Sequence, residues 1–156
     1  MMIIIVTIMA HDDHDGEYDG EHDGVPGGFL FSVVTPSNSL VSLGLSITAG
    51  PTLGMQEVSL YLTPLNKLRS EPLVVFTIPA LSTSWNRLAV MVKGSSVKLF
   101  VNCQHTESLP VTRPHSLHFD PASSLYIGQG GSGFKKPWEG VLQVNINIST
   151  TLQCCR

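Results

Sequence analysis

Charged side chains are scarce in this 156-residue sequence, at 13% of its residues, while apolar residues make up 42%. No Lys or Arg precedes Lys67. Long apolar runs are also missing, since Met1–Ala10 falls short of the roughly 20 residues that a membrane-spanning helix needs. The same run lacks the basic start of a signal peptide. Length and composition therefore predict one globular domain with a sizeable core and no membrane span.

The acidic residues are concentrated near the N-terminus. Seven of the twelve lie between residues 12 and 23, where Asp-Gly recurs in a segment of low complexity. The other five acidic residues and all nine basic residues come later in the sequence. The net charge is therefore −7 before residue 24 and +4 after it. Such a segment cannot bury a core, so we predict a disordered acidic tail over residues 1–24 and a folded domain over 25–156. The run Met1–Ala10 has three interpretations: a truncated signal, an artefact of gene prediction, or a strand.

Motifs of catalysis are missing from the sequence, which has no GxSxG elbow, no HExxH helix and no CxxC pair. The three cysteines, Cys103, Cys154 and Cys155, have the spacing of neither a zinc ribbon nor a thioredoxin-type site. Gly128–Gly133 matches GxGxxG, but Phe134–Trp138 is a poor start for the helix that dinucleotide binding requires. We therefore predict an inter-strand loop there, no cofactor and no enzymatic activity.

Metal-binding side chains occur in two places. His11–His14, Glu17 and His22 lie in the acidic tail without the ligand spacing of an EF-hand, so weak, exchangeable cation binding and a simply solvated tail are both open. His115 and His118 are three residues apart and would point to opposite faces of a strand. Neither pattern predicts a tight metal site.

Short alternating segments separated by Pro and Gly predict β-strands through the rest of the chain. The clearest is Trp85–Cys103, in which apolar and polar residues alternate on both sides of the turn Gly94–Ser96. Gly140–Ile148 alternates as regularly. The other predicted strands are Phe29–Val34, Val41–Ala49, Glu57–Leu62, Leu73–Ile78, Ser116–Phe119 and Ser124–Gln129. Short strands at this spacing are typical of an antiparallel β-sandwich.

The same segments resemble a known extracellular family. The matching stretches are Gly28–Thr35, Leu43–Ser46, Val58–Tyr61, Phe76–Pro79, the Trp85 strand, Val97–Cys103, Leu125–Gly128 and Trp138–Gln143. In this order they are similar to the thrombospondin N-terminal-like domains of the laminin G superfamily, and more narrowly to the multiplexin collagens, types fifteen and eighteen. The family has further strands before the segment matching Gly28, and no Gly-X-Y repeat follows here. The resemblance therefore implies a laminin G-like, concanavalin-like sandwich that lacks its N-terminal strands.

The resemblance also implies a function and a disulfide. The family consists of secreted, non-enzymatic modules of the extracellular matrix that recognise glycosaminoglycans or matrix proteins, with cell adhesion among their roles. It implies one disulfide that joins Cys103 to Cys154 or to Cys155. Oligomerisation would require a collagenous segment elsewhere in a longer chain, and no nucleic-acid partner is implied.

Basic residues at strand ends and in loops are the candidates for binding heparan sulfate or a similar polysaccharide. They are Lys93, Lys98, Arg113, Lys135 and Lys136. If they share an edge they form a modest basic patch, and the alternative is that they are scattered lysines that only solubilise the domain. Asn147 opens the sequon Asn147–Ser149 and is a candidate for glycosylation in a secreted protein.

Two other functions fit a β-sandwich. One is a lectin-like sandwich that recognises a sugar. The other is a jelly-roll glycan hydrolase, which needs two carboxylates across a cleft. The domain has only five acidic residues, which argues against the hydrolase.

Overall fold

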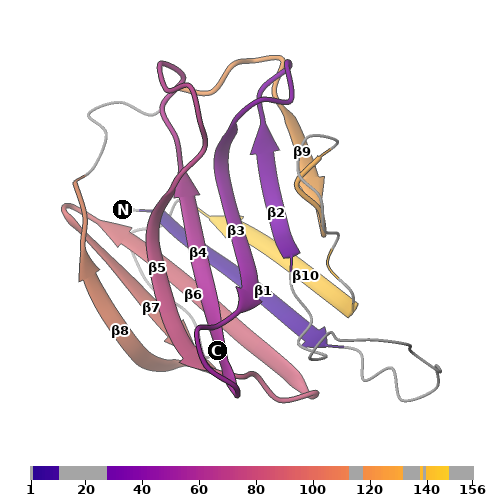
Figure 1. Ribbon diagram of the computed structural model, residues 1–156, viewed down its shortest axis with the longest axis vertical. Helices are drawn as coiled ribbons and strands as arrows, with labels where there is room; N and C mark the ends of the chain where they lie inside the picture. The colour runs from indigo at the N-terminus through magenta and orange to yellow at the C-terminus, as the bar shows by residue number, and fades with distance from the viewer. Residues whose placement is uncertain (1, 11–27, 113–117, 132–137, 139, 148–156) are drawn as a thin grey trace.

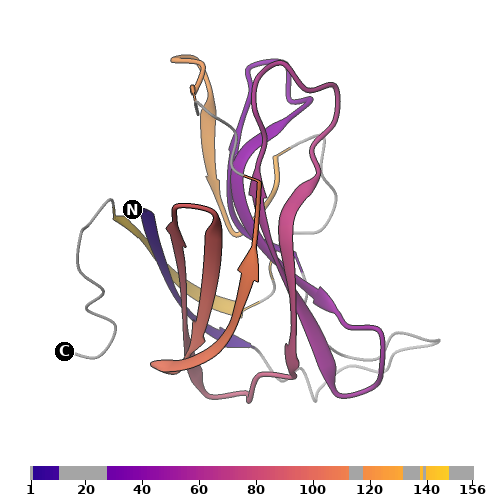
Figure 2. The same ribbon diagram turned by 90° about the vertical axis from the view of Figure 1, so that its left-hand side faces the viewer.

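The computed structural model describes residues 2–10, 28–112, 118–131, 138 and 140–147. Every regular element in these residues is a β-strand. The strands form two antiparallel sheets packed face to face (Figure 1), and Figure 2 shows the two layers from the side. The predicted all-β sandwich is therefore confirmed. No helix among the described residues is long and apolar enough to cross a membrane.

The two sheets have five strands each. Sheet A, in the order β10-β1-β6-β7-β8, consists of β1 (Met2–Ala10), β6 (Trp85–Lys93), β7 (Ser96–Val101), β8 (Gln104–Pro110) and β10 (Gly140–Asn147). Sheet B, in the order β5-β4-β3-β2-β9, consists of β2 (Gly28–Val34), β3 (Val41–Ala49), β4 (Met55–Leu62), β5 (Pro72–Pro79) and β9 (Ser124–Ile127). The strands of the two sheets cross obliquely in Figure 1.

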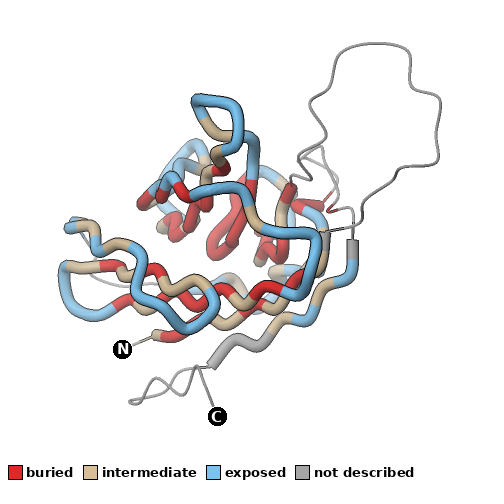
Figure 3. Tube along the Cα trace, turned by 90° about the horizontal axis from the view of Figure 1, so that it is seen from below, coloured by how far each residue is buried: buried red, intermediate tan, exposed pale blue. Residues whose placement is uncertain are grey.

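The hydrophobic core lies between the sheets, because alternate side chains of each strand point inward. Figure 3 shows the buried residues along both layers. Fully buried side chains of sheet A include Ile4, Ile8, Leu88, Val90 and Leu99. Those of sheet B include Phe31, Leu45, Leu60, Phe76 and Ile78. Trp138 belongs to the same cluster and is 8% exposed.

Strand β1 confirms the strand interpretation of Met1–Ala10 and corrects, for these residues, the prediction of a disordered segment over residues 1–24. It pairs with β10 on one side and β6 on the other, so it lies inside sheet A. Ile4, Val6 and Ile8 point into the core, while Ile3 on the opposite face is also only 2% exposed. Strand β1 carries apolar residues on both faces, and this gives a continuous apolar sequence without alternation, which is why the pattern was misleading.

The same strand corrects the expectation that the sandwich lacks strands before Gly28. One strand precedes that residue, and it occupies the middle of its sheet. The histidine- and aspartate-rich stretch over residues 11–24 lies outside the described residues, so the prediction made for it is not tested.

The β6–β7 hairpin is confirmed, and it continues into a strand that the sequence did not predict. The register pairs Met91 with Lys98 and Lys93 with Ser96. The predicted strand was expected to end at Cys103, but β7 ends at Val101 and a second turn leads directly into β8. Polar residues dominate β8, which as an edge strand buries little of its surface.

The remaining strand predictions agree closely with the structure. Strands β4 and β5 begin slightly earlier than predicted, and β9 is shorter than predicted. Ser116–Phe119 was expected to be a strand, but His118 and Phe119 are not part of one, and residues 116–117 lie outside the described residues.

Candidate functional site

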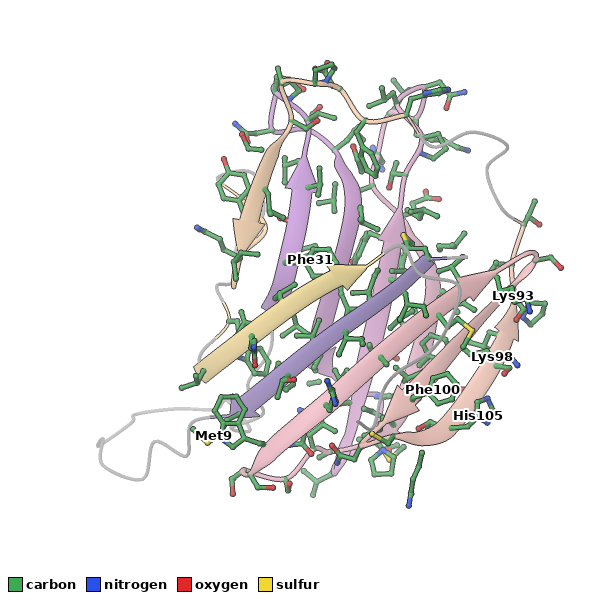
Figure 4. The ribbon with its side chains drawn as sticks, turned by 180° about the vertical axis from the view of Figure 1, so that it is seen from behind. Met9, Phe31, Lys93, Lys98, Phe100 and His105 are labelled. Carbon is green, nitrogen blue, oxygen red and sulfur yellow. The ribbon has the colours of Figure 1, made fainter. Side chains whose placement is uncertain are left out.

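The face of β6 that points away from the core is exposed at its two ends, Trp85 and Lys93, while Ala89 at its centre is fully buried. Leu88, Val90 and Val92 fill the core, so the alternate residues lie on the opposite side of the strand. We call this side, with the residues aligned beside it on neighbouring strands, the outer face of sheet A; Figure 4 views the molecule from that side. The residues that β6 contributes to it are Trp85, Arg87, Ala89, Met91 and Lys93.

Two lysines lie side by side at one end of this face. Lys98 of β7 pairs with Met91, and Lys93 is two residues farther along β6. The two lysines are therefore diagonal neighbours on one face, with their Cβ atoms about 7 Å apart. Lys93 is exposed and Lys98 is half-buried, and Figure 4 shows both at the same corner. We call them the lysine pair.

An aromatic pair adjoins the lysine pair. Phe100 lies two residues beyond Lys98 on β7, and its ring meets that of His105 on β8 in a T-shaped contact with centroids 5.4 Å apart. The Nε2 atom of His105 also lies 2.8 Å from the hydroxyl of Ser108. Both contacts fix the orientation of the imidazole. Figure 4 shows Lys93, Lys98, Phe100 and His105 gathered on one corner of the sheet.

The turn between β7 and β8 holds this corner in place. Asn102 and Cys103 both have positive φ, 49° and 68°, as a two-residue type I′ turn requires. The Asn102 side chain accepts a hydrogen bond from the Arg87 backbone N–H at 2.8 Å and donates one to Asn86 Oδ1 at 3.1 Å. Asn86 is 3% exposed, so the turn is anchored to a buried side chain that positions His105 at the start of β8.

Cys103 is disulfide-bonded. The other two cysteines of the sequence, Cys154 and Cys155, lie outside the described residues. Which of the two cysteines is its partner stays a prediction.

The charge on the outer face of sheet A has one sign among the described residues. Its charged side chains are Arg87, Lys93 and Lys98. The described carboxylates lie elsewhere. Glu57 is on β4, Glu71 is in the β4–β5 loop and Asp120 is in the β8–β9 loop. Glu107 is on the edge strand β8, where it pairs with the buried Leu99. The lysine pair is therefore suited to an anionic partner.

Several predicted site residues lie outside the described residues. Arg113, Lys135 and Lys136 are among them, so whether they join the lysine pair in one patch stays a prediction. Asn147 is the last residue of β10, and residues 148–149 of its sequon are not described. Glycosylation at Asn147 stays a prediction as well.

The remaining motifs have simple structural roles where they are described. Gly128 and Gly131, with φ of 70° and 83°, follow β9 in a loop, which confirms the inter-strand interpretation of the glycine-rich motif for its described residues. Among the described residues no group of three His, Cys, Asp or Glu side chains could hold a metal ion. His118 is exposed, and its predicted neighbour His115 is not described.

A second feature of the outer face was missed from the sequence. Met9 of β1 pairs with Trp85 of β6 on one side and with Val141 of β10 on the other. Trp85 is 51% exposed and Val141 is 45% exposed. We call these three residues the Trp85 row. The alternation of β6 could have identified this row. Trp85 is two residues from Arg87 and therefore lies on the same face of the strand, whereas Leu88 faces the core.

The sandwich is similar to a class of sugar-binding module. The CBM40 module of Ruminococcus gnavus IT-sialidase, in a structure with bound α2,3-sialyllactose, has a TM-score of 0.56 with this chain at 17% identity, covering 92% of this chain and 74% of that one. A second structure of this module has a TM-score of 0.55 at the same identity and coverage. At this identity the likeness shows a shared fold.

At the level of sequence, the chain is similar to a collagen. Over 116 residues it is 28% identical to the Homo sapiens collagen alpha-1(XVIII) chain, which is 74% of this chain and 7% of that protein. The chain thus spans a small part of the curated relative that it matches. No protein-family model matches the sequence, and the laminin G-like assignment stays a prediction.

Proposed function

We propose that this protein is a non-catalytic module of a collagen-like extracellular matrix protein, and that it binds anionic glycosaminoglycans through the outer face of sheet A. The observation that carries the proposal is the charge of that face. Its described charged residues are all cations, and two of them, Lys93 and Lys98, are diagonal neighbours. The similarity to a collagen chain and to a sugar-binding fold supports the same class of function.

The lysine pair has the chemistry that sulfate and carboxylate groups require. Lysine is a compact, hydrated charge on a flexible stem, so it meets an anion at the surface without burial of charge. Phe100 beside it offers an apolar surface to the carbon side of a sugar ring. Attraction between exposed charges is screened over about 8 Å at physiological salt, so binding should weaken steeply as salt is added.

The test compares two double variants on a heparin column and by titration calorimetry. We expect Lys93→Ala/Lys98→Ala to weaken heparin binding by roughly fivefold, because each exposed ion pair contributes up to about 1 kcal/mol. Lys67→Ala/Arg69→Ala is the matched control, since it removes the same charge from the exposed β4–β5 loop. Equal elution of the two variants would mean that net charge alone drives binding, and it would refute the proposed surface.

A second candidate is a lectin-like module that recognises one defined sugar, and the likeness to the CBM40 fold favours it. Such binding depends on hydrogen bonds and shape more than on charge, so it should persist at high salt. A glycan array at low and high salt separates the two candidates. Salt-resistant binding to one glycan, unchanged in Lys93→Ala/Lys98→Ala, would support the lectin.

A further inference from the structure

The Trp85 row lies on the same face as the lysine pair, at its opposite end. Trp85 and Lys93 are the first and last residues of β6, and both belong to the outer face. Eight steps of about 3.3 Å along a strand place them about 26 Å apart. Figure 4 shows Met9, the middle residue of the row, far from Lys93 and Lys98 on the same side of the sheet.

An exposed tryptophan at this position is informative. Indole rings are mostly buried in folded proteins, and an exposed large apolar group often marks a binding surface. Here Met9 lies directly beside Trp85, and Val141 lies directly beside Met9 on its other side, so the three side chains form a continuous apolar strip.

Polar groups adjoin that strip. Thr7 of β1 is two residues from Met9 on the same face, and it pairs with Gln143 of β10. Gln143 is exposed and Thr7 is half-buried. An apolar surface next to a hydroxyl and an amide matches the two sides of a pyranose, which has an apolar C–H face and a rim of hydroxyl groups.

We propose that the Trp85 row is a stacking subsite for one sugar ring of the same polysaccharide that the lysine pair holds by charge. This inference rests on the proposed function. A polysaccharide chain aligned with β6 contacts both ends of the outer face of sheet A, whereas a short oligosaccharide contacts one end only. Linked subsites raise affinity without new contacts, so the module selects long anionic chains over short ones.

The experiment measures binding of the oxidised full chain to heparin fragments of increasing defined length. Wild-type affinity is expected to rise sharply once a fragment exceeds about 26 Å, the separation of the two subsites. Trp85→Ala should lose this gain, with about tenfold weaker binding of long fragments and unchanged binding of short ones, because one of two linked subsites is removed. Trp85→Phe keeps an aromatic ring and should retain most of the gain.

The outcomes separate this inference from the proposed function. Loss of binding in Lys93→Ala/Lys98→Ala, with wild-type behaviour of Trp85→Ala at every length, overturns the stacking subsite alone. If Lys93→Ala/Lys98→Ala binds heparin as tightly as the wild type, both the stacking subsite and the proposed function are overturned. If Trp85→Ala instead converts a dimer to a monomer in light scattering without changing heparin affinity, the row is a self-association surface and the proposal is wrong. Circular dichroism of each variant verifies its fold.

Discussion

The buried hydroxyl groups of Ser32, on β2, and Thr63, just after β4, differ in whether they find a hydrogen-bond partner. Ser32 is fully buried, and its hydroxyl donates to the Gln129 carbonyl at 3.0 Å, which ties β2 to the loop after β9. Thr63, 4% exposed, has a buried hydroxyl with no partner within the described part of the chain. A buried polar group without a partner carries the full cost of its desolvation.

We therefore expect opposite effects on stability at these two positions. Thr63→Val keeps the shape of the side chain and removes the unpaired hydroxyl, so it should raise the free energy of unfolding by up to about 1 kcal/mol. Ser32→Ala removes an existing hydrogen bond and should lower the free energy of unfolding by about 1 kcal/mol. Urea unfolding followed by fluorescence measures both. A Thr63→Val protein less stable than Ser32→Ala would contradict the assignment of the two hydroxyls.

Strand β1 makes a prediction at the scale of the element. Ile8 is 1% exposed and packs in the core, whereas its neighbour Met9 lies half-buried on the outer face. Ile8→Ala should lower the free energy of unfolding by about 2–5 kcal/mol, as large-to-small changes in a core do. Met9→Ala, one residue away on the opposite face, should cost less than half as much.

Thermal unfolding of the two variants decides whether β1 belongs to the core. Similar, small losses of stability in both would mean that β1 is not a structural strand. A larger loss in Met9→Ala than in Ile8→Ala would mean that the register of β1 is shifted by one residue, since such a shift exchanges the two faces of a strand.

Most strands were predictable from the sequence, and β1 and β8 were the exceptions. The β6–β7 hairpin alternates clearly because Leu88 and Val90 face the core while Arg87 and Met91 face outward. Strand β1 carries apolar residues on both faces and β8 carries mostly polar ones, so neither shows the alternation of a half-buried strand. The formation of those two strands depends on pairing with other strands, which the periodicity of their own sequence does not reveal.

The candidate site was predictable in part for the same reason. Lys93 and Lys98 flank a predicted turn, so their proximity follows from the hairpin. The contact between Phe100 and His105 depends on a strand that was not predicted. The Trp85 row requires the pairing of β1 with β6 and β10, strands that are far apart in the sequence.

For the whole molecule, the disulfide at Cys103 makes a further prediction. A bond to Cys154 or Cys155 closes a loop of about 50 residues and should add about 4 kcal/mol to stability on the chain-entropy model. Reduction should therefore lower the urea midpoint substantially. Non-reducing peptide mapping identifies the partner, and Cys154→Ser and Cys155→Ser serve as matched variants. Recovery of Cys103 as an unmodified thiol after oxidative folding would contradict the pairing.

The central position of β1 has a consequence for biosynthesis. Strands β2 to β5 are neighbours both in the sequence and in sheet B, so that sheet can form as soon as they leave the ribosome. Strand β1 is synthesised before all of them, yet its two partners, β6 and β10, follow much later. Its isoleucine-rich strand has neither partner until β6 has been synthesised and lacks the second until β10 follows, and pairing over such sequence distances is slow. We expect chaperones to bind a nascent chain that exposes such an unpaired apolar strand. Premature termination before β10 would leave one edge of β1 without a hydrogen-bonded neighbour.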